Sequence, residues 1–220
     1  MNNNSIKNKI KKIAIIMLGA PGSGKGTQGK LLEEKTGFSR YVMSDLIKKE
    51  LTEGTELHKQ VFKEGILLND SHIFEIFRNN FTSENEVILD GIPRTLDQAY
   101  WLYGFLKNHN YAIKLVFLNV DEKELISRIT SRYYCPKCHR LYNYQIEELK
   151  PQIEGICDED KYELIQREDD TPEIFKDRLK TFNKVKEVIL DVYKAEIIEI
   201  EGDEDIKSIS REIIKKIILE

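Results

Sequence analysis

The segment Gly19-Ala-Pro-Gly-Ser-Gly-Lys-Gly-Thr27 follows a short apolar run, Ile13 to Leu18, and leads directly into a segment with helical spacing that contains Leu31 and Leu32. A buried strand, a glycine-rich loop and a helix in this order are typical of a phosphate-binding loop. The glycines let successive backbone N–H groups point at phosphate oxygens, and Lys25 adds a positive charge. A glycine-rich turn that binds nothing is the alternative, but it does not account for the lysine.

The predicted loop departs from the general pattern at one position. Gly26 stands where the motif usually has Ser or Thr, and the hydroxyl comes one residue later, at Thr27. We therefore do not expect the loop to ligate magnesium directly. The residues expected to hold the donor phosphates are Gly22, Ser23, Gly24, Lys25, Gly26 and Thr27.

Several further apolar runs are short and rich in Ile, Val and Leu, as strands buried on both faces of a parallel sheet are. They are Val87 to Leu89, Ile113 to Val120 and Ile197 to Ile200, with Arg40 to Met43 as a fifth candidate strand. Segments with helical spacing lie between them. This alternation predicts an α/β doubly wound fold.

Two helix starts can be read from capping residues. Asp121 with Glu124 forms a capping box, and Thr171 followed by Pro172 places a cap and a first-turn proline together. The first start predicts a helix that carries Arg128 and Arg132 on one face.

The composition is that of a globular chain. Lys and Arg number 34 against 38 Asp and Glu, a formal net charge of −4, which excludes a generally basic nucleic-acid binder. No apolar run approaches the roughly 20 residues of a membrane span. Residues 1–12 lack the apolar region and cleavage site of a secretory signal, so we expect a leader before the first strand and a cytoplasmic protein without nucleic-acid or membrane partners.

A second motif, Asp90-Gly-Ile-Pro-Arg94, directly follows the apolar run that begins at Val87. It contains an acid, a glycine and an arginine. An acid at the carboxyl end of a parallel strand lies where open α/β sheets bind ligands, and it can hold a hydrated magnesium ion. The alternative is that Asp90 caps a helix from Thr95 to Lys107. Arg94 in the same loop favours the ligand site.

Residues 133–170 interrupt the alternation and contain all three cysteines. Cys135-Pro-Lys-Cys138 and Cys157-Asp-Glu-Asp160 each present two possible ligands separated by two residues, which predicts a structural zinc site of three thiolates and one carboxylate. Asp158 and His139 are alternatives for the fourth ligand. The segment has few large aliphatic residues, so a metal would replace a hydrophobic core.

Two other interpretations of the cysteines remain open. Cys135 to His139 also fits a haem-attachment pattern, and Cys135 with Cys138 can form a redox dithiol. The first leaves Cys157 without a role. The second ordinarily opens a helix after a strand, and the sequence shows no such helix here.

The combination of Gly19 to Thr27 with Asp90-Gly-Ile-Pro-Arg94-Thr-Leu-Asp-Gln98 resembles the adenylate kinase family of nucleoside monophosphate kinases. The similarity runs from Ile13 onward. Other matching segments are Gly54-Thr-Glu-Leu57, Glu64-Gly-Ile-Leu-Leu68, Arg128 with Arg132, and Arg167-Glu-Asp-Asp170 followed by Arg178. The resemblance implies a P-loop nucleoside monophosphate kinase fold with an inserted zinc-binding lid, and transfer of the γ-phosphoryl group of Mg-ATP to AMP, giving two ADP. It also supports Asp160, because zinc lids of long-form members can carry this ligand set.

Phosphoryl transfer needs positioning and charge neutralisation, which bidentate guanidinium groups supply. By resemblance, Lys25 neutralises the β- and γ-phosphates and Asp90 organises Mg²⁺. The arginines that clamp ATP are Arg128 and Arg132, and those that orient the acceptor and the transferred phosphoryl are Arg94, Arg167 and Arg178. Surface salt bridges are the alternative for any one of these arginines alone.

The resemblance extends the two nucleotide sites. It adds Leu141 and Tyr142 on the ATP side. On the AMP side it implies Met43, Lys48, Ile66, Leu67, Leu68, Gly91, Ile92, Pro93, Arg94, Gln98, Arg167 and Arg178, with Gln98 at the base edge.

The chain departs from the family pattern in the acceptor region. Met43 stands where the family has a threonine, and Lys48 where it has an arginine that contacts the acceptor phosphate. Lys48 keeps the positive charge of the arginine but lacks its planar guanidinium group, and Met43 lacks the hydroxyl group of the threonine. A solvated helix face is the alternative for Lys48.

We therefore predict a monomeric adenylate kinase with a leader at 1–12, a core at 13–132 and 171–220 that includes an acceptor-binding segment at 42–71, and a zinc-binding lid at 133–170. Three alternatives remain: a GTP-dependent or other nucleoside monophosphate kinase, a nucleotide-binding relative with reduced turnover, and nucleic-acid binding through the cysteine pairs. The acids around those pairs argue against the last, because they repel backbone phosphates.

Overall fold

A parallel β-sheet forms the centre of the molecule. The computed structural model describes residues 11–62, 68–82, 85–167 and 169–219. Within them, five parallel strands lie in the order β2-β3-β1-β4-β7. Their bounds are Lys12–Gly19 for β1, Ser39–Val42 for β2, Val87–Asp90 for β3, Tyr111–Asn119 for β4 and Ile197–Glu201 for β7. The predicted α/β doubly wound fold is confirmed, and Met43 starts a helix instead of ending a strand.

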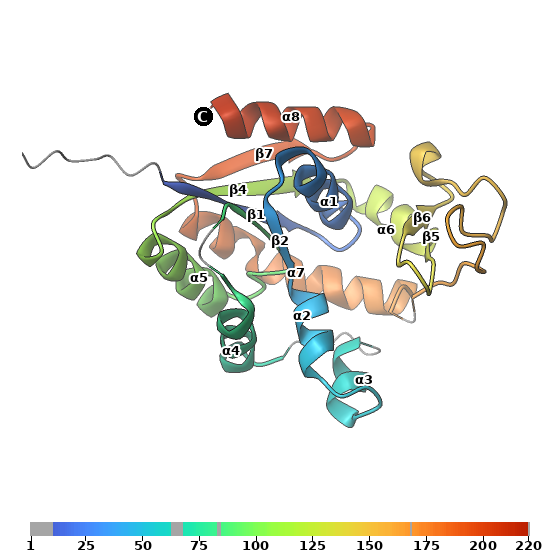
Figure 1. Cartoon of the computed structure of the whole chain (residues 1–220), viewed down its shortest axis with the longest axis horizontal. Helices are drawn as coiled ribbons and strands as arrows, with labels where there is room; N and C mark the ends of the chain where they lie inside the picture. The colour runs from blue at the N-terminus through green and yellow to red at the C-terminus, as the bar shows by residue number, and fades with distance from the viewer. Residues whose placement is uncertain (1–10, 63–67, 83–84, 168, 220) are drawn as a thin grey trace, which may run out of the picture.

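Helices connect the strands and cover the sheet (Figure 1). Their bounds are Lys25–Thr36 for α1, Met43–Glu50 for α2, Glu56–Phe62 for α3, Asp70–Asn80 for α4, Leu96–Asn108 for α5, Glu122–Thr130 for α6, Pro172–Val192 for α7 and Ile206–Leu219 for α8. Asp121 and Thr171 cap α6 and α7 as predicted. The capping box is not formed as predicted, since Asp121 accepts from Lys123 N and Glu124 pairs with Arg128.

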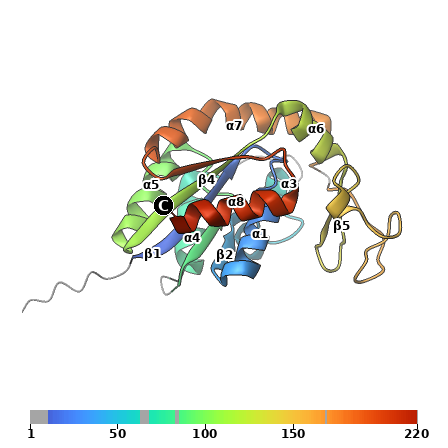
Figure 2. The ribbon, with the colours of Figure 1, turned by 90° about the horizontal axis from the view of Figure 1, so that it is seen from above.

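Alternate residues of β1 pack on opposite faces of the sheet, as the twofold repeat of a strand requires. Ala14 and Ile16 lie in one buried cluster with residues of α4, α5 and α7, whereas Ile15 and Met17 lie in another with residues of α1 and α8. Figure 2 looks down on α8 from the second side. The sheet is therefore apolar on both faces, which leaves its edges and strand ends for polar chemistry.

Residues 132–167 project beyond α6, away from the layered body (Figures 1 and 2). They contain an antiparallel pair, β5 (Arg132–Tyr134) with β6 (Leu141–Asn143), and a short 3₁₀ helix, Glu147–Leu149. Their buried cluster is small: Cys135, Tyr142, Cys157 and Leu164. Two of its four members are cysteines, so the projecting part has little aliphatic packing of its own.

The prediction that Arg128 and Arg132 share one helix face is wrong. The helix α6 ends at Thr130, and Ser131 closes it by donating its N–H to Ser127 O at 3.3 Å. Arg132 then pairs with Asn143 across the antiparallel strands. The strand pairing of the projecting part thus takes the chain out of the helix before it reaches Arg132.

Some predictions fall outside the described residues. Most of the expected leader, residues 1–10, and the acceptor residues Ile66 and Leu67 are among them. Of the leader, Lys12 already belongs to β1. Among the helices of the described ranges, none is both long and apolar enough to cross a bilayer.

Candidate nucleotide-binding site

The loop between β1 and α1 packs against α6. Gly22 has φ of +85°, and a Cβ on it would lie 3.0 Å from Ile129 Cγ1 and 3.1 Å from Leu125 O. Both the conformation and the close approach therefore require glycine. The loop is therefore held close to α6.

Lys25 is the first residue of α1, and its ammonium group lies over the loop. Nζ donates to Gly19 O at 2.7 Å and to Ala20 O at 2.8 Å. The first turn of α1 contains no acidic residue, so nothing there offsets the positive end of the helix dipole. An anion at this helix end would meet an ammonium group and backbone N–H donors together.

Burial lowers the pKa of Lys25 to about 8, although the carboxylate of Asp90 opposes the shift. The guanidinium groups of Arg94, Arg178 and Arg132 make smaller contributions to the same lowering, and the value of about 8 includes all of them. The structure thus brings predicted site residues from the loop, from the segment after β3, from β5 and from α7 into one electrostatic neighbourhood.

The arginines also act on one another. Desolvation and then Arg178 lower the pKa of Arg94, and desolvation and then Arg132 lower the pKa of Arg167. Arg94 and Arg167 both remain exposed. Mutually repelling cations that stay accessible to solvent suit the binding of a polyphosphate, because its charge relieves the repulsion.

Two acids that the sequence analysis did not select hold two of these arginines. Arg132 Nε donates to Asp170 Oδ2 at 2.7 Å, and a second bond joins the same two groups, so the pair is bidentate. Arg178 donates to Asp169 Oδ2 at 2.7 Å. The salt-bridge alternative is therefore realised for both arginines, and the same pairs fix where their remaining N–H donors can point.

Arg128 lies apart from these pairs. Its guanidinium donates to Glu124 Oε1 at 2.9 Å and to Gly202 O at 2.8 Å, in the connection between β7 and α8. The structure therefore places Arg128 and Arg132 in different surroundings, as their different secondary structure requires.

Asp90 ends β3 with a side chain that is nearly buried beside α1. A Cβ on Gly26 would lie 3.8 Å from Asp90 Oδ2, so the carboxylate faces the first turn of α1. Arg40 NH1 is also 3.8 Å from Oδ2, and its Nε donates to Glu33 at 3.0 Å. The sequence analysis missed Arg40, because no motif links the start of β2 with the end of β3.

The alternative role of Asp90 as a helix cap is wrong. Thr95 caps α5, with its hydroxyl accepting from Gln98 N at 3.1 Å. Asp90 is thus left available for the chemistry that the strand end predicts.

The acceptor residues that the structure describes differ in exposure. Met43, Leu68, Ile92 and Gln98 are buried, and Lys48 is exposed on α2. The Gln98 amide is held by two neighbours, because its oxygen accepts from Arg94 N at 2.8 Å and its nitrogen donates to Asp70 at 2.7 Å. Met43 and Ile92 belong to the hydrophobic core, and neither side chain has a group that could donate a hydrogen bond to an acceptor nucleotide.

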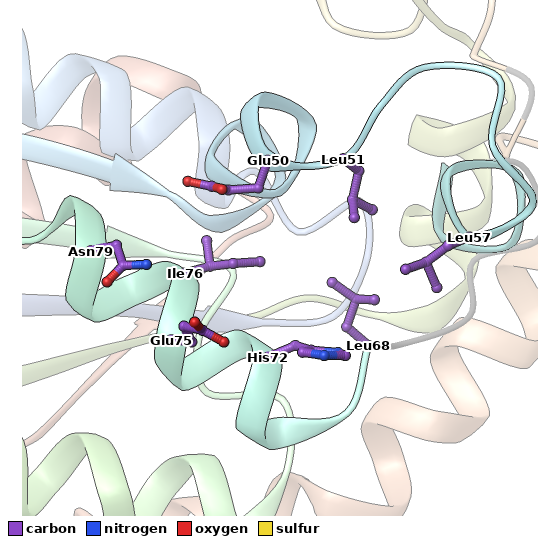
Figure 3. A pocket seen from close by; sticks show the side chains of 8 residues that line it. All are labelled: Glu50, Leu51, Leu57, Leu68, His72, Glu75, Ile76 and Asn79. Atoms are coloured by element: carbon purple, nitrogen blue, oxygen red, sulfur yellow. The ribbon is translucent and has the colours of Figure 1, made fainter.

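A cavity of about 250 Å³ lies between α2, α3 and α4 (Figure 3). Leu51, Leu57, Leu68 and Ile76 form its apolar part, and Figure 3 shows Glu50 and Glu75 at its edge. Leu68 is the one described acceptor residue in its lining. Four of the lining residues, Glu50, Leu51, Leu57 and Leu68, belong to the predicted acceptor segment, whereas the predicted phosphate contact Lys48 does not line the cavity.

Of the two additional ATP residues, Tyr142 is buried in the projecting part. Its hydroxyl donates to Cys157 Sγ at 3.4 Å and accepts from Asp158 N at 2.8 Å. The aromatic side chain is therefore not presented to a ligand, and any contact from Tyr142 must come from its backbone. Leu141 is half-buried in the same strand.

The four predicted zinc ligands are gathered in one place. One ligand atom from each of Cys135, Cys138, Cys157 and Asp160 lies within 4.8 Å of all the others. Cys138 Sγ and Cys157 Sγ are 3.7 Å apart, and Cys135 Sγ is 3.5 Å from Asp160 Oδ2. Tetrahedral zinc with bonds of about 2.3 Å to sulfur and 2.0 Å to oxygen sets these edges at roughly 3.8 and 3.5 Å. The donor set fits zinc in kind and in spacing.

A family model described as adenylate kinase matches residues 17–198. The chain belongs to the adenylate kinase family. It is 34% identical to the adenylate kinase of Onion yellows phytoplasma over 210 residues, 91% of this chain and 96% of that protein. It is 35% identical to the enzyme of Thermotoga maritima over 211 residues, 91% and 95% of the two chains, and 40% identical to that of Mesoplasma florum over 185 residues, 82% and 86%.

Family membership and geometry agree on the reaction class. An adenylate kinase is a nucleoside monophosphate kinase, and this chain is an ATP:AMP phosphotransferase. The reaction brings two phosphate chains together, and clustered cations are the kind of group that offsets the repulsion between such chains.

Lys25→Ala should lower kcat by about 10²–10³-fold, because it removes a donor aimed at developing phosphate charge. The fold should persist. The pKa of Lys25 in the folded protein, about 8, lies below its ordinary value of 10.5, so burial of this ammonium opposes folding fully below about pH 8 and ceases to do so above about pH 10.5. At pH 7 the variant should therefore melt no lower than the unchanged protein. A near-normal kcat, measured with an unchanged circular dichroism melt, would contradict the role.

The kcat/KM for ATP of the unchanged protein should fall as pH rises through about 8, because this parameter follows ionisation of the free enzyme and Lys25 loses its proton there. Bound phosphates favour the charged ammonium, so kcat at saturating ATP should fall only at higher pH. A profile of kcat/KM that stays flat up to about pH 10, near the ordinary pKa of a lysine, would show that Lys25 does not titrate in this range.

Proposed function

We propose that this adenylate kinase transfers the γ-phosphoryl group of Mg-ATP to AMP at the cationic centre formed by Lys25, Arg94, Arg132, Arg167 and Arg178. The observation that carries the proposal is the electrostatic coupling of Lys25 to Arg94, Arg132 and Arg178, which come from separate parts of the chain. A loose, highly charged transition state gains most from such fixed positive charge. No side chain is needed as a general base.

The two nucleotides would bind on different sides of this centre. Residues 22–27, Lys25 among them, would hold the donor phosphates, with Arg128 beside the β7–α8 connection at the nucleoside end. Arg94 and Gln98 would receive the acceptor, together with buried Met43, Leu68 and Ile92. What supports this division is that Arg128 and Gln98 are held by different elements on different sides of the phosphate loop.

Asp90 would hold the hydrated Mg²⁺ that accompanies ATP. Its carboxylate is nearly buried and faces Gly26. An oxygen ligand in this place matches the preference of Mg²⁺, which keeps most of its water when bound to a protein. Because Gly26 has no hydroxyl, Asp90 would carry this function without help from the loop side chain.

Residues 133–170 would act as a lid stabilised by zinc. Backbone N–H groups of Lys137 and Asp160 lie 3.4 and 3.5 Å from Cys135 Sγ and Cys157 Sγ, where they can donate to the thiolates and orient them. Closure of a rigid lid would exclude water, which otherwise competes with AMP for the phosphoryl group. His139 and Asp158 lie outside the four-residue group, which favours Asp160 as the fourth ligand.

We make proposals of the same kind for the oligomeric state, the location and the partners of the protein. The chain would act as a monomer in the cytoplasm without nucleic-acid or membrane partners, and three cysteines without a disulfide favour the cytoplasm. The runner-up activity is a kinase with another donor or acceptor base, and the features that favour it are Met43 and Lys48.

A steady-state assay with AMP, GMP, CMP and UMP as acceptors and ATP or GTP as donor tests the assignment. We expect AMP with ATP to give the highest kcat/KM. Preference for another pair would move the assignment to the runner-up, and binding without turnover would identify a nucleotide-binding relative.

The purified protein should contain one zinc ion per chain, as elemental analysis can measure, and removal of zinc should lower the melting temperature. Cys157→Ser should lose the metal. His139→Ala is the matched control, because His139 lies beside the ligands but outside their group, and it should keep one zinc. Three freely titratable thiols without stoichiometric metal would contradict the site.

Lys48→Arg should lower KM for AMP severalfold and leave KM for ATP unchanged, because a guanidinium group can bind phosphate with two parallel hydrogen bonds. Met43 packs in the core, so Met43→Thr alone should cost stability. The double variant tests whether the pocket has adapted to methionine. If neither Lys48→Arg nor the double variant binds AMP more tightly than the unchanged protein, Lys48 belongs to a site for a different acceptor.

A further inference from the structure

The N-termini of α4 and α5 meet at the carboxylate of Asp70, a residue of the predicted acceptor segment that is not among the predicted site residues. Asp70 is the first residue of α4. Its Oδ1 accepts a hydrogen bond from Gln98 Nε2 at 2.7 Å, and its Oδ2 accepts one from the Thr95 hydroxyl at 2.9 Å. Thr95 in turn caps α5. A single carboxylate therefore joins the acceptor segment to the helix that carries Gln98.

These bonds determine which way the Gln98 amide faces. The Asp70 carboxylate can only accept hydrogen bonds, whereas the backbone N–H of Arg94, 2.8 Å from Gln98 Oε1, can only donate. One orientation of the amide satisfies both neighbours. The reversed orientation would put oxygen against oxygen at Asp70 and N–H against N–H at Arg94.

The positions of the remaining hydrogen-bond donor and acceptor of the Gln98 amide are then fixed as well. A glutamine amide has two N–H donors and two acceptor lone pairs. With one donor used by Asp70 and one acceptor position used by Arg94, one of each remains for a ligand. Adenine presents an amino donor and ring-nitrogen acceptors, so a donor and an acceptor in a fixed order can distinguish it from guanine, whose oxygen replaces the amino group.

Arg94 adds a link to the phosphate side. Its backbone N–H holds the amide of Gln98, and its own Nε donates to Gly91 O at 3.0 Å. Asp70, Gln98 and Arg94 thus form one chain of hydrogen bonds between the predicted base contact and a predicted phosphate contact.

We infer that Asp70 is a positioning residue of the acceptor site, which fixes the orientation of the Gln98 amide and thereby the selection of the acceptor base. The inference rests on the proposed function, in which Gln98 contacts that base. Asp70 itself acts through Gln98 and Thr95.

Asp70→Ala tests the inference in the full-length enzyme. It should raise KM for AMP about tenfold, the effect expected for one buried polar group that loses its partner, and leave KM for ATP within about twofold. The ratio of kcat/KM for AMP to that for GMP should fall, since the freed amide can turn. Asp70→Asn should restore most of the AMP affinity, because its oxygen can accept from Gln98 while its nitrogen donates to Thr95.

Asp97→Ala is the matched control. Asp97 is an exposed acid in the first turn of α5, next to Gln98, and it supplies the same kind of helix-terminal charge. We expect wild-type KM values for both nucleotides. If Asp97→Ala matches the effect of Asp70→Ala, or if Asp70→Ala leaves KM for AMP unchanged, the inference is wrong.

Exchanging the hydrogen-bond donor and acceptor between Asp70 and Gln98 separates an effect on AMP recognition from an effect on the stability of the fold. Gln98→Glu places two carboxylates together and should lower the melting temperature. Asp70→Asn combined with Gln98→Glu should recover that temperature, because the introduced amide can donate to the new carboxylate, while KM for AMP stays high because position 98 has no N–H. Recovery of AMP affinity in the double variant would overturn the inference. Preference of the unchanged protein for another monophosphate would instead contradict the proposed acceptor, and the same variants would then be measured with that acceptor.

Discussion

Repulsion among the positive side chains around the phosphate loop is the constraint on which the rest of the site depends. Lys25 is close enough to Arg94, Arg132 and Arg178 for each of them to lower its pKa. Such a group costs stability in the protein alone, and it is held together by elements that gain their stability elsewhere. The apolar faces of the sheet and the helices on both sides provide that stability, so the strand ends can carry unfavourable charge.

Carboxylates moderate this charge without cancelling it. Asp170 holds Arg132 and Asp169 holds Arg178, whereas Arg94 and Arg167 are exposed to solvent. The paired arginines are positioned, and the exposed ones are accessible to a ligand. Positioned charge and accessible charge both favour polyphosphate binding, the first because it needs little reorganisation and the second because a ligand can reach it.

The parts of the molecule that follow from local chemistry could be predicted from the sequence. The five strands, the caps at Asp121 and Thr171 and the gathering of the cysteines each depend on residues close in the chain or on strong spacing rules. The position of Arg132 could not be predicted, because it depends on the pairing of β5 with β6, a contact with Asn143 that no periodicity indicates. Arg40 beside Asp90 was missed for the same reason, since it depends on the order of strands in the sheet.

The two proposed nucleotide sites differ in the same way in how far the sequence predicts them. The residues predicted to hold the donor phosphates lie on one continuous segment, in which β1, the loop and α1 follow each other, so their sequence signal is strong. In the proposed function the acceptor side is assembled from α2, α4 and the segment after β3, where hydrogen bonds run between Asp70, Gln98 and Arg94 across 28 and 4 residues of sequence. A change at one of these positions alters what the others can bind. Departures from the family pattern such as Met43 and Lys48 are therefore more informative about the acceptor than any change in the loop, because the loop recognises phosphate, which every nucleotide has.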